Sequence, residues 1–77
     1  MNLDILTPDK KLFEGEAESV TVPGSTGLMQ ILKGHAALIS SLNKGVVKVK
    51  TSTGEEIFDI KGGVVEVLNN KVIVLAE

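Results

Sequence analysis

Turn-forming residues recur at short intervals along the whole chain, and this spacing is the feature that most limits its fold. Thr7–Lys10 is typical of a type I turn, with Pro8 at the second position. Further turn signals stand at 23–27, 33–35, 43–45, 53–54 and 69–70. Most intervals between these signals hold five to twelve residues, which is too few for a typical helix with its caps.

Within the intervals, apolar and polar residues alternate with a period of two. Val47 and Val49 fall on one face and Lys48 and Lys50 on the other. Valine, isoleucine and threonine, whose branched side chains favour strands, number 21 of the 77 residues. The pattern predicts a single all-β domain over residues 1–77, a sandwich or barrel of eight or nine strands. We expect strands near residues 2–6, 11–14, 17–22, 28–32, 36–41, 45–51, 55–61, 63–68 and 71–76.

Two segments leave alternatives open. Residues 36–42 could form two helical turns instead of a strand. The apolar run Leu28–Leu32 does not alternate cleanly, so a single face cannot bury all of its apolar side chains. It is either a strand buried on both faces or an exposed patch that docks on another protein.

Charge and composition exclude several classes of protein. The chain has no arginine and a net charge of −2, which argues against nucleic-acid binding. It has no cysteine, and its longest apolar run, Val72–Ala76, is far shorter than a membrane span. Residues 1–8 carry no signal-peptide pattern, so we expect a reducing compartment such as the cytoplasm. Glu14, Glu16 and Glu18 indicate a solvated strand edge.

No residue pattern points to catalysis, a metal or a cofactor. His35 is the only imidazole, and no orienting carboxylate stands near it in sequence. Ser40 or Ser41 could join a hydrolytic triad, but the nucleophile elbow is missing. Gly62–Gly63 is followed by a strand, which favours a bend over a phosphate site. The sequence therefore favours a protein-binding or structural module over an enzyme.

Several sequence blocks, in order and at compatible spacing, resemble the epsilon subunit of F-type ATP synthases. The first block is the Leu-Asp strand, Thr-Pro turn and Phe-x-Gly of residues 3–15. The others are the Val-Pro-Gly-x-x-Gly of 22–27, the Ile-Leu-x-x-His-Ala of 31–36, the Gly-Val of 45–46, the Gly-Gly-x-x-Glu-Val of 62–67, and the Asn-Lys-Val ending of 70–76. They are spread over nearly the whole length of the chain.

The resemblance implies a flattened β-sandwich of two roughly five-stranded sheets. It also implies a non-catalytic place on the rotor's central stalk, at the cytoplasmic face of the energy-transducing membrane as a peripheral part of F1. There the epsilon subunit binds the gamma subunit and touches the polar loops of the c-ring, without inserting into the membrane. It helps to couple ion translocation to ATP synthesis or hydrolysis.

The resemblance also implies contact residues. Carried over position by position, the gamma-facing residues are Thr7, His35 and Ser40. The ring-facing loop corresponds to Gly27, Leu28, Met29, Gln30, Ile31 and Leu32. Leu28 stands where many family members carry an acid, and Gln30 where they carry glycine. We therefore expect a more apolar ring contact than is usual in the family.

The chain ends at Glu77, where typical members continue into a helical hairpin that can inhibit ATP hydrolysis and, in some, binds ATP. It is either a naturally short epsilon subunit, which Met1 slightly favours, or a domain cut at its boundary. We expect neither hairpin function. A rival is a biotinyl or lipoyl carrier domain, but the lysines at its expected turns, Lys44 and Lys71, lack the carrier motifs Met-Lys-Met and Asp-Lys-Ala.

Overall fold

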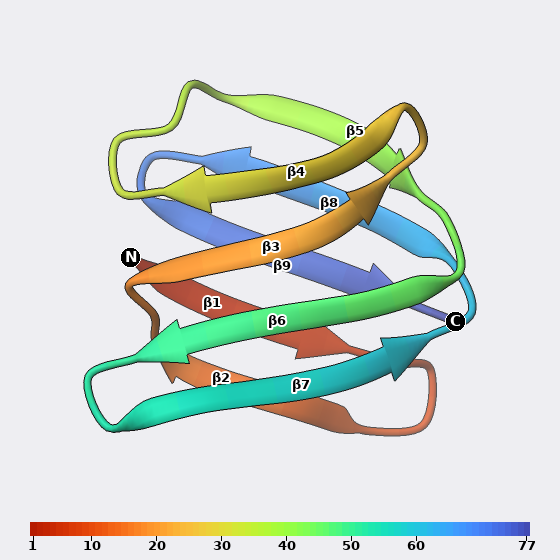
Figure 1. Cartoon of the computed structure of the whole chain (residues 1–77), viewed down its shortest axis with the longest axis horizontal. Helices are drawn as coiled ribbons and strands as arrows, with labels where there is room; N and C mark the ends of the chain where they lie inside the picture. The colour runs from red at the N-terminus through yellow and green to blue at the C-terminus, as the bar shows by residue number, and fades with distance from the viewer.

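The computed structural model describes residues 1–77 and contains nine strands and no helix (Figure 1). The all-β prediction is confirmed, and each predicted strand has its counterpart. The strands are β1 (Asn2–Leu6), β2 (Lys11–Glu16), β3 (Ser19–Gly24), β4 (Gly27–Leu32), β5 (Leu38–Leu42), β6 (Gly45–Thr51), β7 (Gly54–Ile60), β8 (Gly63–Leu68) and β9 (Lys71–Ala76).

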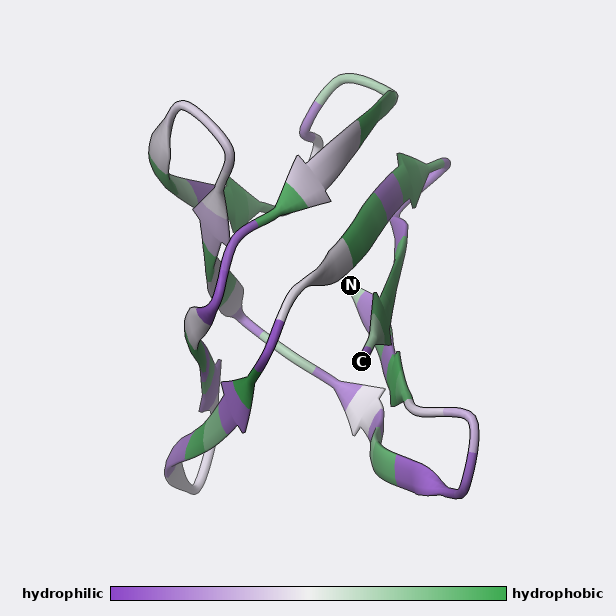
Figure 2. Ribbon diagram, turned by 90° about the vertical axis from the view of Figure 1, so that its right-hand side faces the viewer, coloured by the Kyte–Doolittle hydropathy of each residue, from purple (hydrophilic) through white to green (hydrophobic).

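The strands form two facing layers, seen end-on in Figure 2. The five-stranded layer has the order β2-β1-β9-β8-β5, with β1 parallel to β9 and the other neighbours antiparallel. The four-stranded layer has the order β4-β3-β6-β7 and is wholly antiparallel. The two layers join at one corner, where Gly24 of β3 pairs with Leu42 of β5. The predicted sandwich of two roughly five-stranded sheets is confirmed, with five and four strands.

The core lies between the layers and is almost entirely aliphatic. Every second residue of the central strands faces inward, and the fully buried side chains are Leu3, Ile5, Val20, Val22, Ile31, Val47, Val49, Val65, Val72 and Val74. Each such side chain stabilises the fold by roughly 1.5–3 kcal/mol relative to an exposed one. At the lower rim in Figure 1, the edge strands β2 and β7 meet through Phe13 and Phe58, whose rings pack edge to face at 6.2 Å.

The largest difference from the predicted strand bounds is at β3. The expectation placed its end at residue 22 and read Pro23–Gly27 as a loop, whereas the strand runs to Gly24 and only Ser25–Thr26 form the turn. Proline is tolerated here because β6 pairs only with the first half of β3, up to Thr21. The missing N–H of Pro23 therefore breaks no ladder bond with β6.

Both ambiguous segments are strands. Residues 38–42 form β5 rather than helical turns, because pairing with β8 along its length satisfies the backbone. The run Leu28–Leu32 lies in β4, which pairs only with β3 and is therefore an edge strand. Its Met29 and Ile31 face the core, while Leu28 and Leu32 are exposed. The strand is buried on one face only, so the expectation of a strand buried on both faces is wrong, and Leu28 and Leu32 form exposed apolar surface.

Two backbone sites fix the hairpin of β8 and β9. Asn69 and Asn70 both adopt positive φ, 51° and 64°, as the centre of a tight two-residue hairpin turn requires. At the opposite end, Gly63 pairs with Ala76, and a Cβ added to Gly63 would lie 2.1 Å from the Leu75 carbonyl oxygen. The bend predicted at Gly62–Gly63 is confirmed, and glycine is required there for close approach.

We predict that Gly63→Ala destabilises the fold much more than Gly54→Ala. The two glycines have similar positive φ values, 148° for Gly63 and 146° for Gly54, but a Cβ at Gly54 meets nothing within 4 Å. Gly54→Ala should cost only the backbone strain, on the order of 1 kcal/mol. Gly63→Ala adds the collision and should cost roughly 3 kcal/mol or more. Urea unfolding of both variants measures the difference, and equal losses would contradict the close approach.

Candidate docking surfaces

The outward face of the five-stranded layer carries apolar side chains in register across three strands. Leu6 of β1 lies opposite Leu75 of β9, and Leu75 lies opposite Val64 of β8. Leu75 is 51% exposed, and Leu6 and Val64 are half-buried. We call these three residues the apolar row. They face outward because their neighbours in each strand are the inward-facing core residues.

The next row on the same face mixes charge and apolar surface. It runs from Asp4 through Ile73 and Glu66 to Ile39, which is 72% exposed. Asp4 is paired with the ammonium of Lys71, 3.3 Å away. Charged groups therefore border the apolar row on one side, an arrangement seen at protein interfaces, where a polar rim surrounds an apolar centre.

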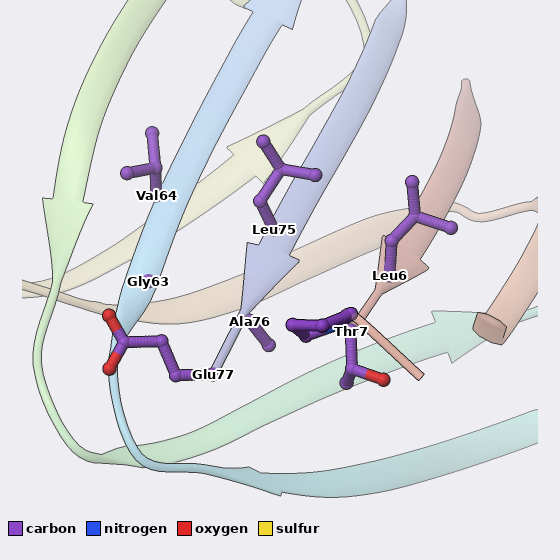
Figure 3. A pocket seen from close by; sticks show the side chains of 8 residues that line it. Leu6, Thr7, Gly63, Val64, Leu75, Ala76 and Glu77 are labelled. Carbon is purple, nitrogen blue, oxygen red and sulfur yellow. The ribbon is translucent and has the colours of Figure 1, made fainter. Parts of the chain in front are cut away.

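All three residues of the apolar row line a hollow in the surface (Figure 3). The hollow has a volume of about 420 Å³ and is lined by Leu6, Thr7, Pro8, Gly63, Val64, Leu75, Ala76 and Glu77. In the close-up, the side chains of Leu6, Leu75 and Val64 point to the same side of their strands. An open, largely apolar hollow of this kind can receive an apolar side chain of a partner protein.

Only one of the three predicted gamma contacts lines this hollow. Thr7 lies at its edge, and its hydroxyl closes the β1–β2 turn: it accepts the N–H of Lys10 at 3.1 Å and donates to the Lys10 carbonyl oxygen at 3.0 Å. Ser40 lies opposite the core residue Val65, and its hydroxyl donates to the Ser41 carbonyl oxygen at 3.2 Å. Its side chain therefore points between the layers.

His35 lies apart from Thr7. Its loop, residues 33–37, is at the opposite end of the sandwich from the β1–β2 turn (Figure 1). The ring is half-buried, and its Nδ1 lies 2.7 Å from the Ala36 carbonyl oxygen. No carboxylate is bonded to this ring, so the geometry offers no acid–base pair. The three residues can share a partner only if that partner extends along the layer.

The predicted ring-contact residues form a strand rather than a loop. Gly27–Leu32 is β4, and the loop proper is the two-residue turn before it. Gly27, Leu28, Gln30 and Leu32 are exposed, whereas Ile31 is fully buried and Met29 packs on the core. From Leu28 to Leu32, only alternate side chains can therefore touch a partner without unfolding the hairpin.

Other candidate chemistry finds little support in the geometry. No group of three or more His, Asp or Glu side chains is placed to hold a metal ion. Lys71, considered as a carrier lysine, is the first residue of β9 and is ion-paired with Asp4 instead of projecting from a turn. No helix long and apolar enough to cross a membrane is present.

Sequence reasoning missed the apolar row and Ile39. The signal is present in the apolar run Val72–Ala76, which lies within the strand expected at residues 71–76. A five-residue apolar strand presents apolar side chains on both faces, so one face must meet something other than its own core. Apolar surface concentrated in this way on a small β-sandwich is typical of a domain that docks on other proteins.

The chain belongs to the family described as ATP synthase, Delta/Epsilon chain, beta-sandwich domain, which matches residues 1–77. The ATP synthase epsilon chain of Chlorobaculum tepidum is 50% identical over 76 residues, covering 97% of this chain and 86% of that protein. The epsilon chain of Campylobacter jejuni is 44% identical over 78 residues, and this chain spans 60% of its length. The resemblance found in the sequence is thereby confirmed.

Solved structures show the same fold. A chain in the OSCP/F1/c-ring assembly of Euglena gracilis mitochondrial ATP synthase superposes with a TM-score of 0.88 and 23% identity, over 96% of this chain and 48% of that one. A chain in the central stalk/c-ring of the Tetrahymena thermophila mitochondrial ATP synthase superposes with a TM-score of 0.86 and 19% identity. The match covers 99% of this chain and 62% of that one. At these identities the likeness concerns the β-sandwich.

We predict that two neighbouring residues of β9 differ sharply in their effect on stability. Leu75→Thr should change the free energy of unfolding by no more than about 0.5 kcal/mol, because the side chain is half-exposed on the outer face. Val74→Ala should cost about 2 kcal/mol, since Val74 is fully buried. Chemical denaturation of both variants tests this, and a large loss for Leu75→Thr would mean that the apolar row stabilises the isolated fold.

Proposed function

We propose that this chain is a non-catalytic subunit of the ATP synthase rotor. It binds the gamma subunit and touches the polar loops of the c-ring, helping to couple ion translocation to ATP synthesis or hydrolysis. Its place is peripheral, on the central stalk of F1 at the cytoplasmic face of the membrane. The observation that carries the proposal is the apolar row with its hollow, in a domain whose family is that of the epsilon chain.

The gamma subunit docks on the outward face of the five-stranded layer. There the hollow beside Thr7 receives an apolar side chain, and Ile39 extends the contact toward the loop that holds His35. Burying the exposed part of an apolar side chain stabilises an interface by roughly 25 cal/mol per Å². Thr7, with its hydroxyl committed to the turn, contributes shape at the rim of the hollow.

The c-ring touches the other layer. The β3–β4 hairpin belongs to the four-stranded layer, so a partner on it does not compete with one on the apolar row. Its outward-facing residues Leu28 and Gln30 carry no charge, and Leu28 is 79% exposed. The contact is therefore made by an apolar side chain and an amide, without an acid.

We predict that Leu75→Lys abolishes co-elution with the gamma subunit of the same organism. A lysine there would put a charge into the apolar row beside the hollow, and an unpaired buried charge is strongly unfavourable at an interface. The readout is size-exclusion chromatography of the mixed subunits at micromolar concentration.

Ile57→Lys is the matched control. Ile57 is 60% exposed on β7 of the other layer, where it lies opposite Lys48, and the variant should bind gamma normally. Circular dichroism confirms that both variants are folded. Loss of gamma with Ile57→Lys but not with Leu75→Lys would place the gamma subunit on the four-stranded layer and overturn this assignment.

A substitution in the hairpin should separate the two partners. Leu28→Asp is expected to lower retention on purified c-rings several-fold, because it replaces the most exposed apolar side chain by a charge, while gamma binding stays unchanged. Thr53→Asp, in the turn between β6 and β7, is the control that should leave ring binding intact. If the Leu28→Asp variant in complex with the gamma subunit still binds the c-ring normally, Leu28 is not part of the ring contact.

A further inference from the structure

The four edge strands of the sandwich are not alike. β2 carries Lys11, Glu14 and Glu16, and β7 carries Glu55, Glu56 and Asp59. Charged side chains of this kind keep an edge from pairing with another chain. β4 and β5 carry no charged residue at all. They also hold the two most exposed large apolar side chains of the protein, Leu28 at 79% and Ile39 at 72%.

β4 has free main-chain groups on its outer edge. The Pro23 carbonyl oxygen accepts the N–H of Asn43, so it points away from β4, and Pro23 and Leu28 are a non-hydrogen-bonded pair. By the alternation of an antiparallel ladder, the N–H and C=O groups of Leu28 and Gln30, and the N–H of Leu32, point toward the free edge. No other strand pairs with that edge.

β5 offers less. The Ser41 carbonyl oxygen already accepts the N–H of Ser25 at 3.1 Å, and Leu42 is bridged to Gly24 at the corner of the sandwich. A partner strand therefore finds a longer free ladder on β4 than on β5.

The free groups of β4 require an extended backbone as their partner, and the side chains indicate which one. The outward sequence Leu28-x-Gln30-x-Leu32 reads the same in both directions. When two copies pair antiparallel about Gln30, each Leu28 lies opposite a Leu32 and the two Gln30 lie opposite each other. The Leu32 carbonyl oxygen, which accepts the N–H of His35, keeps a second lone pair for this ladder.

We propose that a second copy of this chain covers the β4 edge, giving a twofold dimer that extends the four-stranded layer into a continuous eight-stranded sheet. The same pairing at β7, about Ile57, would set Glu55 opposite Asp59, and the charged side chains of β2 disfavour pairing at that edge. Because the c-ring contact proposed above uses the same strand, the dimer is the state of the unassembled chain. The proposal does not depend on gamma binding, which uses the other layer.

Sedimentation velocity of the purified chain from about 10 µM to about 1 mM tests the dimer. The mass should rise with concentration toward twice the 8.1 kDa of one chain, because a short edge ladder buries less area than a permanent interface. Gln30→Glu keeps the shape of the side chain but sets two charges opposite each other. It should weaken association at least about tenfold.

Ile39→Glu is the matched control, with the same new charge on the other uncharged edge, and it should dimerise like the unaltered chain. A monomer at every concentration, in a chain shown by circular dichroism to be folded, overturns the proposal. So does a dimer that survives Gln30→Glu or is lost in Ile39→Glu. Loss of gamma binding by Gln30→Glu in a chain that never dimerises would assign the edge to gamma instead.

A second readout uses the absence of native cysteine. In the twofold ladder the Cα atoms of the two Gln30 residues lie about 5.5 Å apart, within the range of a disulfide. Oxidised Gln30→Cys should therefore run as a covalent dimer on non-reducing gels. Ser52→Cys, exposed in the turn between β6 and β7, should not. Equal cross-linking of both variants would indicate random collision and contradict the dimer.

Discussion

The burial of alternate aliphatic residues between the two layers is the constraint on which the rest of this structure depends. With no cysteine and only two aromatic residues, the chain holds its layers together through fully buried valine, leucine and isoleucine side chains. Each strand must therefore keep a strict period of two, and a slip of one residue would turn the core outward. That strictness also fixes what faces solvent, since the position next to each core residue is necessarily outside. The docking surfaces are thus consequences of the core register.

This dependence explains how far the sequence could predict the fold. Val47 and Val49 alternate with lysines, so their burial could be predicted directly from the sequence. The alternation of Phe58 and Ile60 with Asp59 likewise predicts that these two side chains share one face of their strand. Turn propensity misled the prediction at Pro23, because the tolerance of proline depends on which strand pairs with which half of β3. Such pairing is a long-range property that no local pattern contains. The same holds for Gly63, whose close approach to β9 is invisible in its own neighbourhood.

The candidate site was less predictable than the fold, for a related reason. Resemblance supplies positions, but it does not supply the face on which a side chain lies. Ser40 was carried over as a contact, yet its register opposite Val65 turns it inward and leaves Ile39 as the exposed neighbour. The apolar row needs three strands in register before it exists at all, since Leu6 and Leu75 are 69 residues apart in sequence and meet only through the parallel β1–β9 pair. A surface of this kind is a product of topology.

Charged residues are distributed unevenly over the edge strands, so the two rims of the sandwich differ in their ability to pair with another chain. One rim is closed by the packing of Phe13 against Phe58 and guarded by charged edges, so it needs no partner. The other rim has a single bridge at Gly24, two uncharged edges and the most exposed apolar side chains. A small domain gains little net stability from its own core, and leaving an edge without charge adds a risk of unwanted pairing. An uncharged edge is therefore expected where strand pairing serves a purpose. For this reason we assign the partner strand to the rim with the two uncharged edges and not to the rim with the charged edges.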